Sequence, residues 1–406
     1  MSRCIVCNCD RVTALLDLGR QAVSSHFTKT PDPPVVEHDL GFAHCAACGV
    51  MQLAKPFPYR DLVRPYDWIT YREPETHLDA VVERIGTLID LGQIEAAAGI
   101  TFKDKTTLER LGRRGVSRVW SLDAREDLGA TDALADIETV QALLTPEKAA
   151  GIVKSRGQAD LLIVRHIAEH SEAPARFMAA LAAMLAPDGL LVVEIPDCSA
   201  NLARQDYSMI WEEHTLYLTG ETAPQILAAA GCTLVHKEVH PFAFEDVIVL
   251  YARKSARGTA PIPADPGAIE RSGALAHSFA GAFAGWTERY RHLFDDMTRD
   301  GRRLAAYGAG HLTCAFLNFH GLVDDFAFVV DDTPHKQGLF LPKARLPIVP
   351  RSRLSANEVS ACLFGLSPEI EDKVIANNRD YVAAGGQFYS MFVDSPRSIR
   401  KLLPAS

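Results

Sequence analysis

The sequence predicts an α/β protein of three parts, a small zinc-binding module followed by two Rossmann-like domains. Three observations lead to this fold class. Two C-x2-C pairs near the N-terminus are typical of a zinc-binding module. Two longer stretches alternate strand-like apolar runs with helical patterns, as doubly wound parallel sheets do. The segment KSARGTAPIPADPG separates these stretches and is typical of a linker, so we expect domains at 1–60, 61–255 and 256–406.

The composition is that of a soluble globular protein. Apolar residues make up 48% of the chain and charged residues 23%, with a net charge of −9. The sequence has no strongly basic stripe, so we expect no nucleic-acid partner. It has no apolar signal core and no run of about 18 apolar residues, so we expect no membrane partner. We therefore expect a cytoplasmic protein, a monomer or weak homo-oligomer, whose nine cysteines are thiols or metal ligands.

The N-terminal module is predicted from Cys4 and Cys7, which form one pair, and Cys45 and Cys48, which form the other. Two such pairs can hold Zn²⁺ in a tetrahedral thiolate site, and four thiolates leave no open position, so the zinc would be structural. Cys9 is a spare thiol, and His44 is a possible substitute ligand. The alternative is four unrelated buried cysteines.

A polar aromatic segment follows the module and contains Tyr66, Trp68, Tyr71 and Arg72. Two interpretations stay open: the cluster forms a lid over an active site, or it packs the small module against the next domain. A helix is expected next, near 78–89, because apolar residues recur there with a period close to 3.6.

The first α/β domain is predicted from alternating segments. Strands are expected at 97–102, 117–122, 159–164, 189–195, 232–236 and 247–252, and helices from 106, at 173–185 and at 222–230. Asp123 follows the second strand, a position that suits a carboxylate bound to ribose hydroxyls.

The loop YSMIWEEHTLYLT at 207–219 follows a strong strand and is the densest group of proton-transfer residues in the chain. It places Glu212 and Glu213 beside His214, with Tyr207, Trp211 and Tyr217 around them. Ligands bind at this end of the strands in open α/β sheets. The alternative is a solvated loop whose aromatic side chains fill the core.

The second α/β domain begins after a long amphipathic helix expected at 268–299. Strands are expected at 303–306, 326–330, 360–364 and 387–391. The first strand leads into Tyr307-Gly308-Ala309-Gly310-His311, where glycines let backbone N–H groups face an anion at a helix N-terminus. Asp331 and Asp332 end the next strand, and Lys336 follows in a polar loop.

These parts stand in an order that resembles the bacterial sugar C-methyltransferases, which act on nucleotide-linked keto-sugars. The resemblance covers nearly the whole chain at five separated places. They are the cysteine pairs with LLDLGRQAVSSHF, ADLLIVRHIAEH followed by LAAMLAPDGLLVVEIPD, IWEEHTLYLT, AAYGAGHLTCAFLNF, and VVDDTPHKQGLFLPKARLPIV.

The resemblance implies methyl transfer from S-adenosylmethionine to a sugar carbon. By this analogy His214 removes the α-proton of the keto-sugar to give an enolate, Glu213 orients the imidazole, and Tyr217 or a nearby donor supports the enolate oxygen. The implied cofactor-binding residues are Asp104, Asp123 and His166. The implied partner is a nucleotide-diphosphate sugar, bound by Tyr71, Trp211, Tyr307, Gly308, His311, Asp332 and Lys336.

Three departures from the family pattern bear on the cofactor and the site. Thr101 and Lys105 fill both glycine positions of the cofactor loop, and we expect their side chains to crowd S-adenosylmethionine. Trp211 replaces a tyrosine, and the stretch 240–246 lacks a Gly-Gly-Ser motif.

Three hypotheses follow from the resemblance and its departures. The first is C-methyl transfer with an altered cofactor loop. The second is a methyltransferase-fold protein without the methyl donor, which enolises, epimerises or only binds a nucleotide sugar. The third is a silent partner subunit that uses the helix at 268–299 as an interface.

Overall fold

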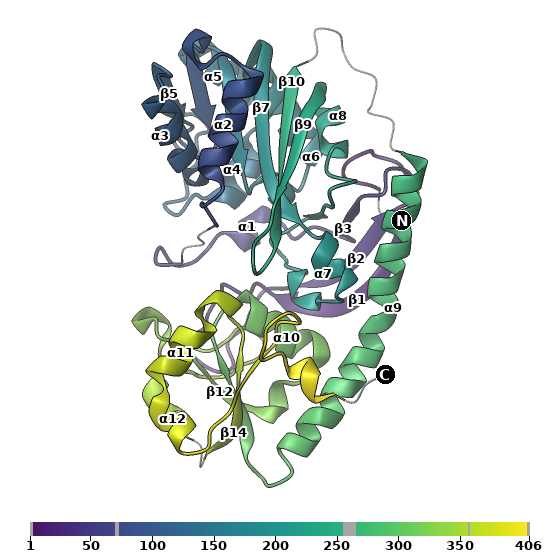
Figure 1. The fold of residues 1–406 in the computed structure, drawn as a ribbon, viewed down its shortest axis with the longest axis vertical. Coiled ribbons are helices and arrows are strands. Elements are labelled where there is room, and N and C mark those ends of the chain that lie inside the picture. Colours follow the sequence, from purple (N-terminus) through teal and green to yellow (C-terminus); the bar gives the residue numbers. More distant parts are fainter. Residues whose placement is uncertain (1–2, 70–72, 255–264, 356–357, 404–406) are drawn as a thin grey trace.

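The computed structural model describes residues 3–69, 73–254, 265–355 and 358–403, so the predicted positions Tyr71 and Arg72 lie outside the described residues. It contains three sheets of four, six and five strands (Figure 1). The six-stranded and five-stranded sheets belong to two stacked α/β domains, and the four-stranded sheet lies at their side. The predicted α/β fold class is confirmed, with its small N-terminal module and second α/β domain.

The N-terminal sheet is antiparallel and has the order β1-β2-β3-β8. Its first three strands are β1 (Val12–Ala22), β2 (Glu37–Cys45) and β3 (Met51–Leu53). The fourth, β8 (Leu216–Tyr217), comes from the loop at 207–219, far away in sequence. It pairs with β3 through Met51 with Tyr217 and Gln52 with Leu216. The predicted catalytic loop is therefore an integral strand of the N-terminal module.

The middle sheet has the order β5-β4-β6-β7-β10-β9. The four strands β4 (Ala96–Gly99), β5 (Arg118–Ser121), β6 (Ala159–Arg165) and β7 (Leu185–Asp197) are parallel, whereas β9 (Cys232–His240) and β10 (Asp246–Lys254) run antiparallel. Strands β6 and β7 are almost continuously buried, as strands covered on both faces are. Strand order reverses at β4, between β5 and β6, where open α/β sheets form a ligand crevice.

Helices cover both faces of this sheet. On one face lie α2 (Leu78–Leu88) and α3 (Lys105–Arg113), and on the other α4 (Ile137–Leu143), α5 (Pro146–Arg156), α6 (Pro174–Met184) and α8 (Gln225–Ala229). No helix was expected from the sequence in the segment that forms α4 and α5. The short helices α1 (Tyr59–Leu62) and α7 (Ser199–Ala203) lie in connections.

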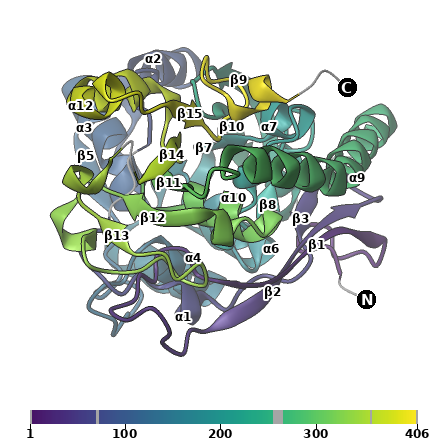
Figure 2. The ribbon, with the colours of Figure 1, turned by 90° about the horizontal axis from the view of Figure 1, so that it is seen from below.

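The C-terminal sheet is parallel throughout, with the order β13-β12-β11-β14-β15 (Figure 2). Its strands are β11 (Arg303–Tyr307), β12 (Phe326–Val330), β13 (Ile348–Val349), β14 (Val359–Phe364) and β15 (Phe388–Ser390). Helix α10 (His311–His320) packs on one face, and α11 (Glu371–Asn377) and α12 (Arg379–Ala383) pack on the other. Strand order reverses at β11, between β12 and β14.

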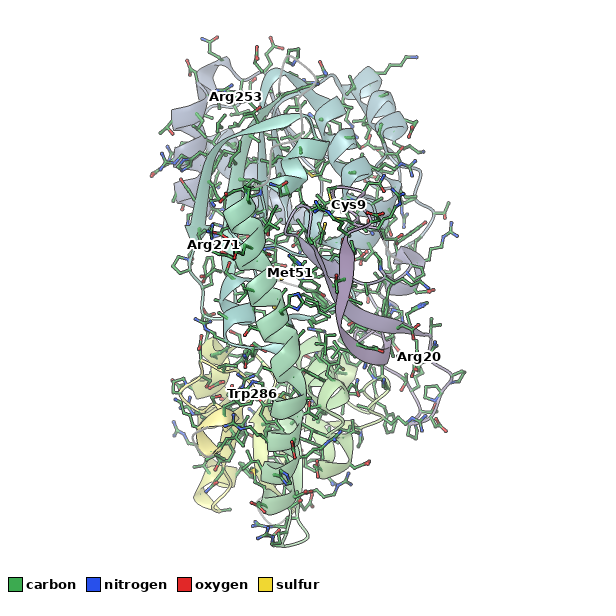
Figure 3. The ribbon with its side chains drawn as sticks, turned by 90° about the vertical axis from the view of Figure 1, so that its right-hand side faces the viewer. Cys9, Arg20, Met51, Arg253, Arg271 and Trp286 are labelled. Atoms are coloured by element: carbon green, nitrogen blue, oxygen red, sulfur yellow. The ribbon has the colours of Figure 1, made fainter. Side chains whose placement is uncertain are left out.

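Helix α9 (Pro266–Met297) runs along all three parts (Figures 1 and 3). Its residues Ala276 and Phe279 pack against the N-terminal sheet, and Tyr290 and Phe294 pack in the C-terminal domain. Ser272 Oγ donates to the carbonyl of Gly49 at 2.5 Å. The apolar face of α9 is thus buried against other parts of the same chain. Within the described residues, no helix combines the length and apolar character needed to cross a membrane.

Candidate active site

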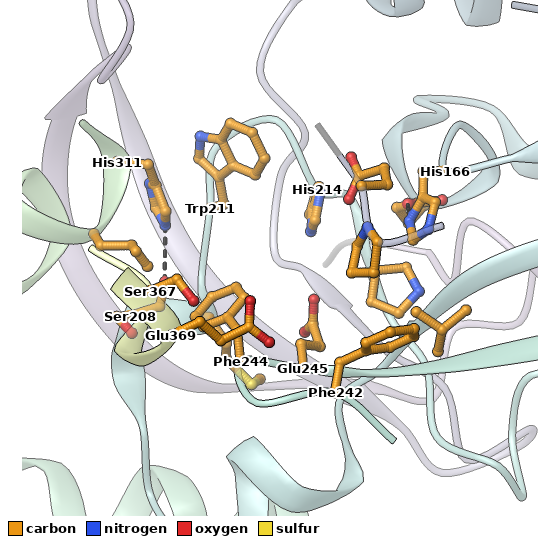
Figure 4. A pocket seen from close by; sticks show the side chains of 17 residues that line it. His166, Ser208, Trp211, His214, Phe242, Phe244, Glu245, His311, Ser367 and Glu369 are labelled. Atoms are coloured by element: carbon orange, nitrogen blue, oxygen red, sulfur yellow. Dashed lines mark hydrogen bonds and ion pairs between the residues drawn. The ribbon is translucent and has the colours of Figure 1, made fainter. Parts of the chain in front are cut away.

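A cavity of about 410 Å³ lies between the middle and C-terminal domains (Figure 4). Its walls come from the ends of β6 and β7, the loops before β8 and β10, and the segments after β11 and β14. The reversal point of the C-terminal sheet, between β11 and β14, therefore faces this space, and the middle sheet faces it with the ends of β6 and β7. Its size falls in the usual range for small-molecule sites. The lining residues are Glu73, Pro74, His166, Glu169, Pro196, Ser208, Met209, Trp211, His214, Phe242, Phe244, Glu245, Val247, His311, Leu312, Ser367 and Glu369.

The loop that carries His214 is held on two sides. Glu212 accepts a hydrogen bond from the backbone N–H of Ser24 at 2.5 Å, on the side of the N-terminal module. Thr215 donates its N–H to the carbonyl of Glu169 at 2.7 Å and its hydroxyl to that of Ser171 at 2.6 Å. Together with the β3–β8 pairing, these bonds fix the backbone on both sides of His214.

His214 faces the cavity with a neutral imidazole. Burial is the largest cause that lowers its pKa, and the nearby positive charge of Lys103 adds to the effect, bringing the pKa to about 3. At pH 7 the ring therefore carries a lone pair that can accept a proton. The rings of Trp211 and His170 lie 4.8 Å and 4.7 Å from it, measured between centroids.

Tyr217, predicted to support an enolate oxygen, has a structural role instead. The residue is fully buried, does not line the cavity, and sits in β8. Its hydroxyl donates to the carbonyl of Trp211 and accepts from the N–H of the same residue, both at 3.1 Å. The prediction was wrong because the hydroxyl of Tyr217, although close to His214 in sequence, forms its hydrogen bonds with the backbone of its own loop.

Glu213 also differs from its predicted role, because it reaches a different histidine. Its carboxylate is buried and lies within 4.8 Å of ligand atoms of Glu138 and His170. His170 Nδ1 and Glu138 Oε1 are 2.6 Å apart. Burial and neighbouring carboxylates raise the pKa of both Glu213 and Glu138 well above the ordinary value. Glu213 thus belongs to a buried carboxylate–imidazole group behind His214, and sequence adjacency alone did not reveal Glu138.

His166 carries a positive charge on the cavity wall. Its ring lies 3.0 Å from Glu194 Oε1 and 3.4 Å from Glu169 Oε1. Although burial lowers its pKa, these carboxylates and Glu73 outweigh that effect and raise the pKa to about 10. The backbone of His166 has a φ of 47°, a left-handed conformation that non-glycine residues seldom adopt and that often occurs at functional sites.

The loop after β4 corrects the prediction for Asp104. This carboxylate is fully buried and accepts backbone N–H groups from Ile100 at 2.6 Å, Thr101 at 2.7 Å and Arg165 at 2.8 Å. These bonds occupy it in shaping the loop, so it offers no free contact to a cofactor. Thr101 is likewise a cap, whose hydroxyl accepts from Lys103 N.

The outer side of the same loop is covered by the segment 73–75. The ammonium group of Lys103 is buried and pairs with Glu73 at 2.5 Å. The Thr106 hydroxyl donates to Glu75 at 2.7 Å, and the buried guanidinium of Arg165 donates to the carbonyl of Pro74 at 3.3 Å. We expected Lys105 to crowd the cofactor, but Lys103 is the lysine that occupies this space, and Lys105 is exposed.

Asp123 fits a role in cofactor binding better than Asp104 does. It is exposed after β5, where one carboxylate oxygen accepts the N–H groups of Arg125 and Glu126, both at 2.8 Å. The other oxygen is available for ribose hydroxyls. Asp123 therefore fits the ribose of S-adenosylmethionine. The contacts of residues 73–75 with the loop after β4, in contrast, cover the place where the methionine part of this cofactor would bind.

The predicted sugar-binding residues separate into two groups. Trp211 and His311 line the cavity, with ring centroids 5.0 Å apart. Tyr307 donates to Asp332 at 2.9 Å, and Lys336 pairs with Asp331 at 3.1 Å, all at the strand ends of the C-terminal sheet. Gly308, with φ of 105°, belongs to this edge, where a Cβ would come within 3.0 Å of the Gly365 carbonyl. A hollow beside Asp332 is lined by Gln337 and Arg351.

The aromatic cluster after the N-terminal module packs against the C-terminal domain. Trp68 stacks on Phe27, Tyr66 and His335, with centroid distances of 6.0, 4.8 and 5.8 Å. Both Tyr66 and Trp68 lie against the core of that domain. For these two residues the structure shows packing, but against the C-terminal domain and not against the next domain in the sequence.

The four predicted metal ligands meet at the end of the N-terminal module. Sγ atoms of Cys4 and Cys48 are 3.7 Å apart, as are those of Cys7 and Cys45, and all four lie within 4.8 Å of one another. Sulfurs around a tetrahedral zinc ion, about 2.3 Å from the metal, are separated by about 3.8 Å. The donor set and its spacing fit a structural zinc site.

The surrounding backbone also suits zinc. Asn8 and Gly49 adopt the positive φ expected of the turns after each pair. Backbone N–H groups of Cys7 and Ala47 point at the sulfurs of Cys4 and Cys45, at 3.5 and 3.4 Å, as outer-shell donors do. His44 is not among the four clustered ligands, and Cys9 lies 3.3 Å from Cys45 as a fifth thiol.

Comparison with known proteins agrees with this architecture. Residues 97–237 match the family model described as a methyltransferase domain, and residues 272–392 match the C-methyltransferase C-terminal domain. The chain therefore carries a methyltransferase domain and a C-methyltransferase C-terminal domain. It is 25% identical over 404 residues to the C-methyltransferase NovU of Streptomyces niveus, covering 96% of this chain and 94% of that protein. The chain is thus a methyltransferase-like enzyme.

Two solved methyltransferase structures also overlap with part of this chain. N-methyltransferase NodS from Bradyrhizobium japonicum WM9 is 15% identical, with 43% of this chain and 86% of that chain covered and a TM-score of 0.26. Magnesium protoporphyrin IX methyltransferase from Synechocystis PCC 6803 is 14% identical, with 46% and 90% covered and a TM-score of 0.30. Overlaps this low carry no information about individual side chains.

Zinc removal should disturb the active-site loop as well as the module. Cys48→Ser removes a ligand next to the turn that leads into β3, so we expect loss of bound zinc, unpairing of β8 and a lower melting temperature. Elemental analysis and amide hydrogen exchange at 211–217 measure these effects. Cys9→Ser is the matched control and should keep one zinc per chain. Unchanged exchange in zinc-free Cys48→Ser would contradict the coupling.

Tyr217→Phe should affect stability more than catalysis. The change removes the hydroxyl that bonds both the N–H and the carbonyl of Trp211, which costs about 1–2 kcal/mol in the free energy of unfolding. Because the hydroxyl does not reach the cavity, we expect less than a tenfold fall in kcat. Urea unfolding and steady-state kinetics measure the two effects, and a hundredfold loss of kcat with normal stability would restore a catalytic role.

Proposed function

We propose that this enzyme methylates a carbon next to the carbonyl of a nucleotide-linked keto-sugar, and that His214 removes the proton from that carbon. The observation that carries the proposal is the neutral imidazole of His214 on the wall of a cavity between the middle and C-terminal domains. A base must be unprotonated at working pH and must lie where the substrate binds. The lowered pKa of His214 supports the first condition, and its place on the cavity wall supports the second.

The residues of the chain divide the chemistry between them. His214 accepts the α-proton, and the electrons of the broken C–H bond pass into an enolate. The positive charge of His166 supports the enolate oxygen, in the role that the sequence analysis gave to Tyr217. When bound, S-adenosylmethionine supplies an electrophilic methyl group, and Asp123 would hold its ribose hydroxyls.

His311 and Trp211 help to place the sugar. The Nε2–H of His311 donates to the carbonyl of Ser208 at 2.8 Å, and its Nδ1 lies 3.8 Å from Glu212 Oε2, so the ring is held in place on the cavity wall. Trp211 presents a ring beside it, and sugar rings commonly lie against such aromatic surfaces. The nucleotide diphosphate would extend along the Tyr307–Lys336 edge of the C-terminal sheet, beside the hollow that Arg351 lines.

A second candidate function, enolisation of a nucleotide sugar without a methyl donor, is favoured by one observation. The Glu73–Lys103 pair and the Pro74–Arg165 contact cover the loop where the methionine part of the cofactor would approach. Proton abstraction by His214 does not need that loop to open. The two candidates therefore differ in their dependence on S-adenosylmethionine.

His214→Asn tests the shared step and separates the candidates. With a nucleoside-diphosphate keto-sugar in heavy water, we expect the wild-type enzyme to incorporate deuterium at the α-carbon. The variant should be slower by about 10²- to 10⁴-fold, the usual contribution of a general base. Mass spectrometry with and without S-adenosylmethionine then shows whether a methyl group is added. His320→Asn, which alters a buried histidine of α10 outside the cavity lining, is the control. Equal exchange by His214→Asn and wild type would contradict the proposal.

The low pKa of His214 also predicts a pH effect on stability. The folded pKa of about 3 lies below the ordinary 6.5, so between these values the unfolded chain binds the proton and the folded chain does not. The free energy of unfolding should therefore fall as pH drops below about 6.5, by up to about 1.4 kcal/mol per pH unit from this group. Urea unfolding from pH 7 to pH 4 should show a shallower fall for His214→Gln. Parallel curves would contradict the buried, neutral imidazole.

A further inference from the structure

Cys9 is the thiol of the N-terminal module that remains when the four metal ligands have been assigned. Its Sγ lies 3.3 Å from Cys45 Sγ. The ligand sulfurs themselves are farther apart, at 3.7 Å for Cys4 and Cys48 and 3.7 Å for Cys7 and Cys45, which is the spacing that a shared zinc ion sets. Zinc coordination therefore does not account for the closer contact between Cys9 and Cys45.

The backbone holds these two sulfurs side by side. Cys45 is the last residue of β2 and pairs with Val12, the first residue of β1, which follows Cys9 closely in sequence. The N–H of Ala46 donates to the carbonyl of Arg11 at 2.9 Å, which extends the same pairing toward Cys9. A disulfide has an S–S length of about 2.0 Å, so the two sulfurs need to approach each other by about 1.3 Å. Because the fold has already brought the two segments together, a small side-chain movement closes this bond.

Solvent reaches Cys9 but few of the other thiols. Cys9 is half-buried at the end of the N-terminal module (Figure 3), Cys7 is exposed, and the other seven cysteines of the chain are buried. A small oxidant therefore meets the sulfur of Cys9 or Cys7 first, and Cys45 lies behind them with no exposed surface. Redox-sensitive cysteines typically combine access for the oxidant with a second, resolving thiol at contact distance. Cys9 and Cys45 together have both properties.

We propose that Cys9 and Cys45 form a reversible disulfide when the protein meets hydrogen peroxide, and that this bond removes Cys45 from the metal site. The S–S bond forms as the O–O bond of the peroxide breaks. The two sulfurs supply two electrons, and the peroxide is reduced to two molecules of water. These take up one proton from Cys9 and a second from Cys45, or from solvent where Cys45 is held as a thiolate. A small thiol reverses the step by thiol–disulfide exchange. This bond forms whichever reaction the cavity carries out.

Oxidation of Cys45 reaches the active-site loop through the N-terminal sheet. The metal site then keeps one thiolate fewer than a structural zinc site needs, so zinc is released. Cys45 also closes the turn into β3, because its carbonyl accepts from the N–H of Gly49 at 2.9 Å and its own N–H donates to the carbonyl of Val50 at 3.0 Å. Strand β3 in turn pairs with β8, the segment that follows His214. The disulfide therefore loosens the loop of His214.

Treatment of the full-length protein with hydrogen peroxide tests the inference on wild type and Cys9→Ser. Peptide mapping by mass spectrometry identifies the disulfide, a metal indicator follows the release of zinc, and amide hydrogen exchange at 211–217 reports on the loop. In wild type we expect a Cys9–Cys45 disulfide, zinc release and faster exchange, all reversed by dithiothreitol with added zinc. Cys9→Ser should lose its zinc about tenfold more slowly, because it lacks the resolving thiol. Untreated Cys9→Ser is the control and should exchange at 211–217 as the untreated wild type does.

Each outcome has a defined meaning. Oxidised wild type without a Cys9–Cys45 bond, for example with a Cys7–Cys45 disulfide or with Cys9 as sulfinic acid, overturns the inference. Zinc release from Cys9→Ser at the wild-type rate overturns it as well. The disulfide map needs no bound metal, so protein purified without zinc gives the same decision. A Cys9–Cys45 disulfide that leaves exchange at 211–217 unchanged would overturn the link to the active-site loop.

Discussion

The pairing of β8 with β3 is the interaction on which the active site depends. The pairing is short and joins Leu216 to Gln52 and Tyr217 to Met51. Through it, the segment that follows His214 becomes the fourth strand of the sheet that the N-terminal residues form. A strand of two residues has little stability of its own. The β2–β3 hairpin that holds it ends in the turn of the second cysteine pair, so a zinc ion there would stabilise catalytic geometry at a distance.

A buried polar network completes the support behind His214. Glu194 contacts Arg165, His166 and His77, and Glu138 and Glu213 lie near His170. Buried charges cost several kcal/mol each unless partners and hydrogen bonds compensate them. Such a network has few low-energy arrangements, which keeps the imidazole of His214 in a fixed electrostatic environment. It also explains why the site tolerates the left-handed backbone of His166.

The two α/β domains contribute different chemistry to the cavity. The middle domain supplies His214, the cationic ring of His166 and the carboxyl groups of Glu169 and Glu245. The C-terminal domain supplies His311, Ser367 and Glu369 from the segments after β11 and β14. Helix α9 packs on the N-terminal sheet and the C-terminal domain along its length, so these two parts are held by a common element.

The sequence by itself determined the three-part α/β architecture, the cysteine tetrad and the place of His214. Alternating apolar runs, paired cysteines and turn glycines are local patterns, and they persist whatever the rest of the chain does. It did not reveal β8, whose existence depends on a partner strand about 160 residues away.

Only the tertiary structure decided which side chains are free to act. The sequence suggested roles in the site for Tyr217, Asp104 and Glu213. The side chains of Tyr217 and Asp104 are instead hydrogen-bonded to backbone groups, and that of Glu213 lies near His170. Conversely, Glu138, Lys103 and Glu73 reach the site from distant segments. The physical reason is that burial and hydrogen-bond partners, which set charge and availability, are properties of packing rather than of sequence order.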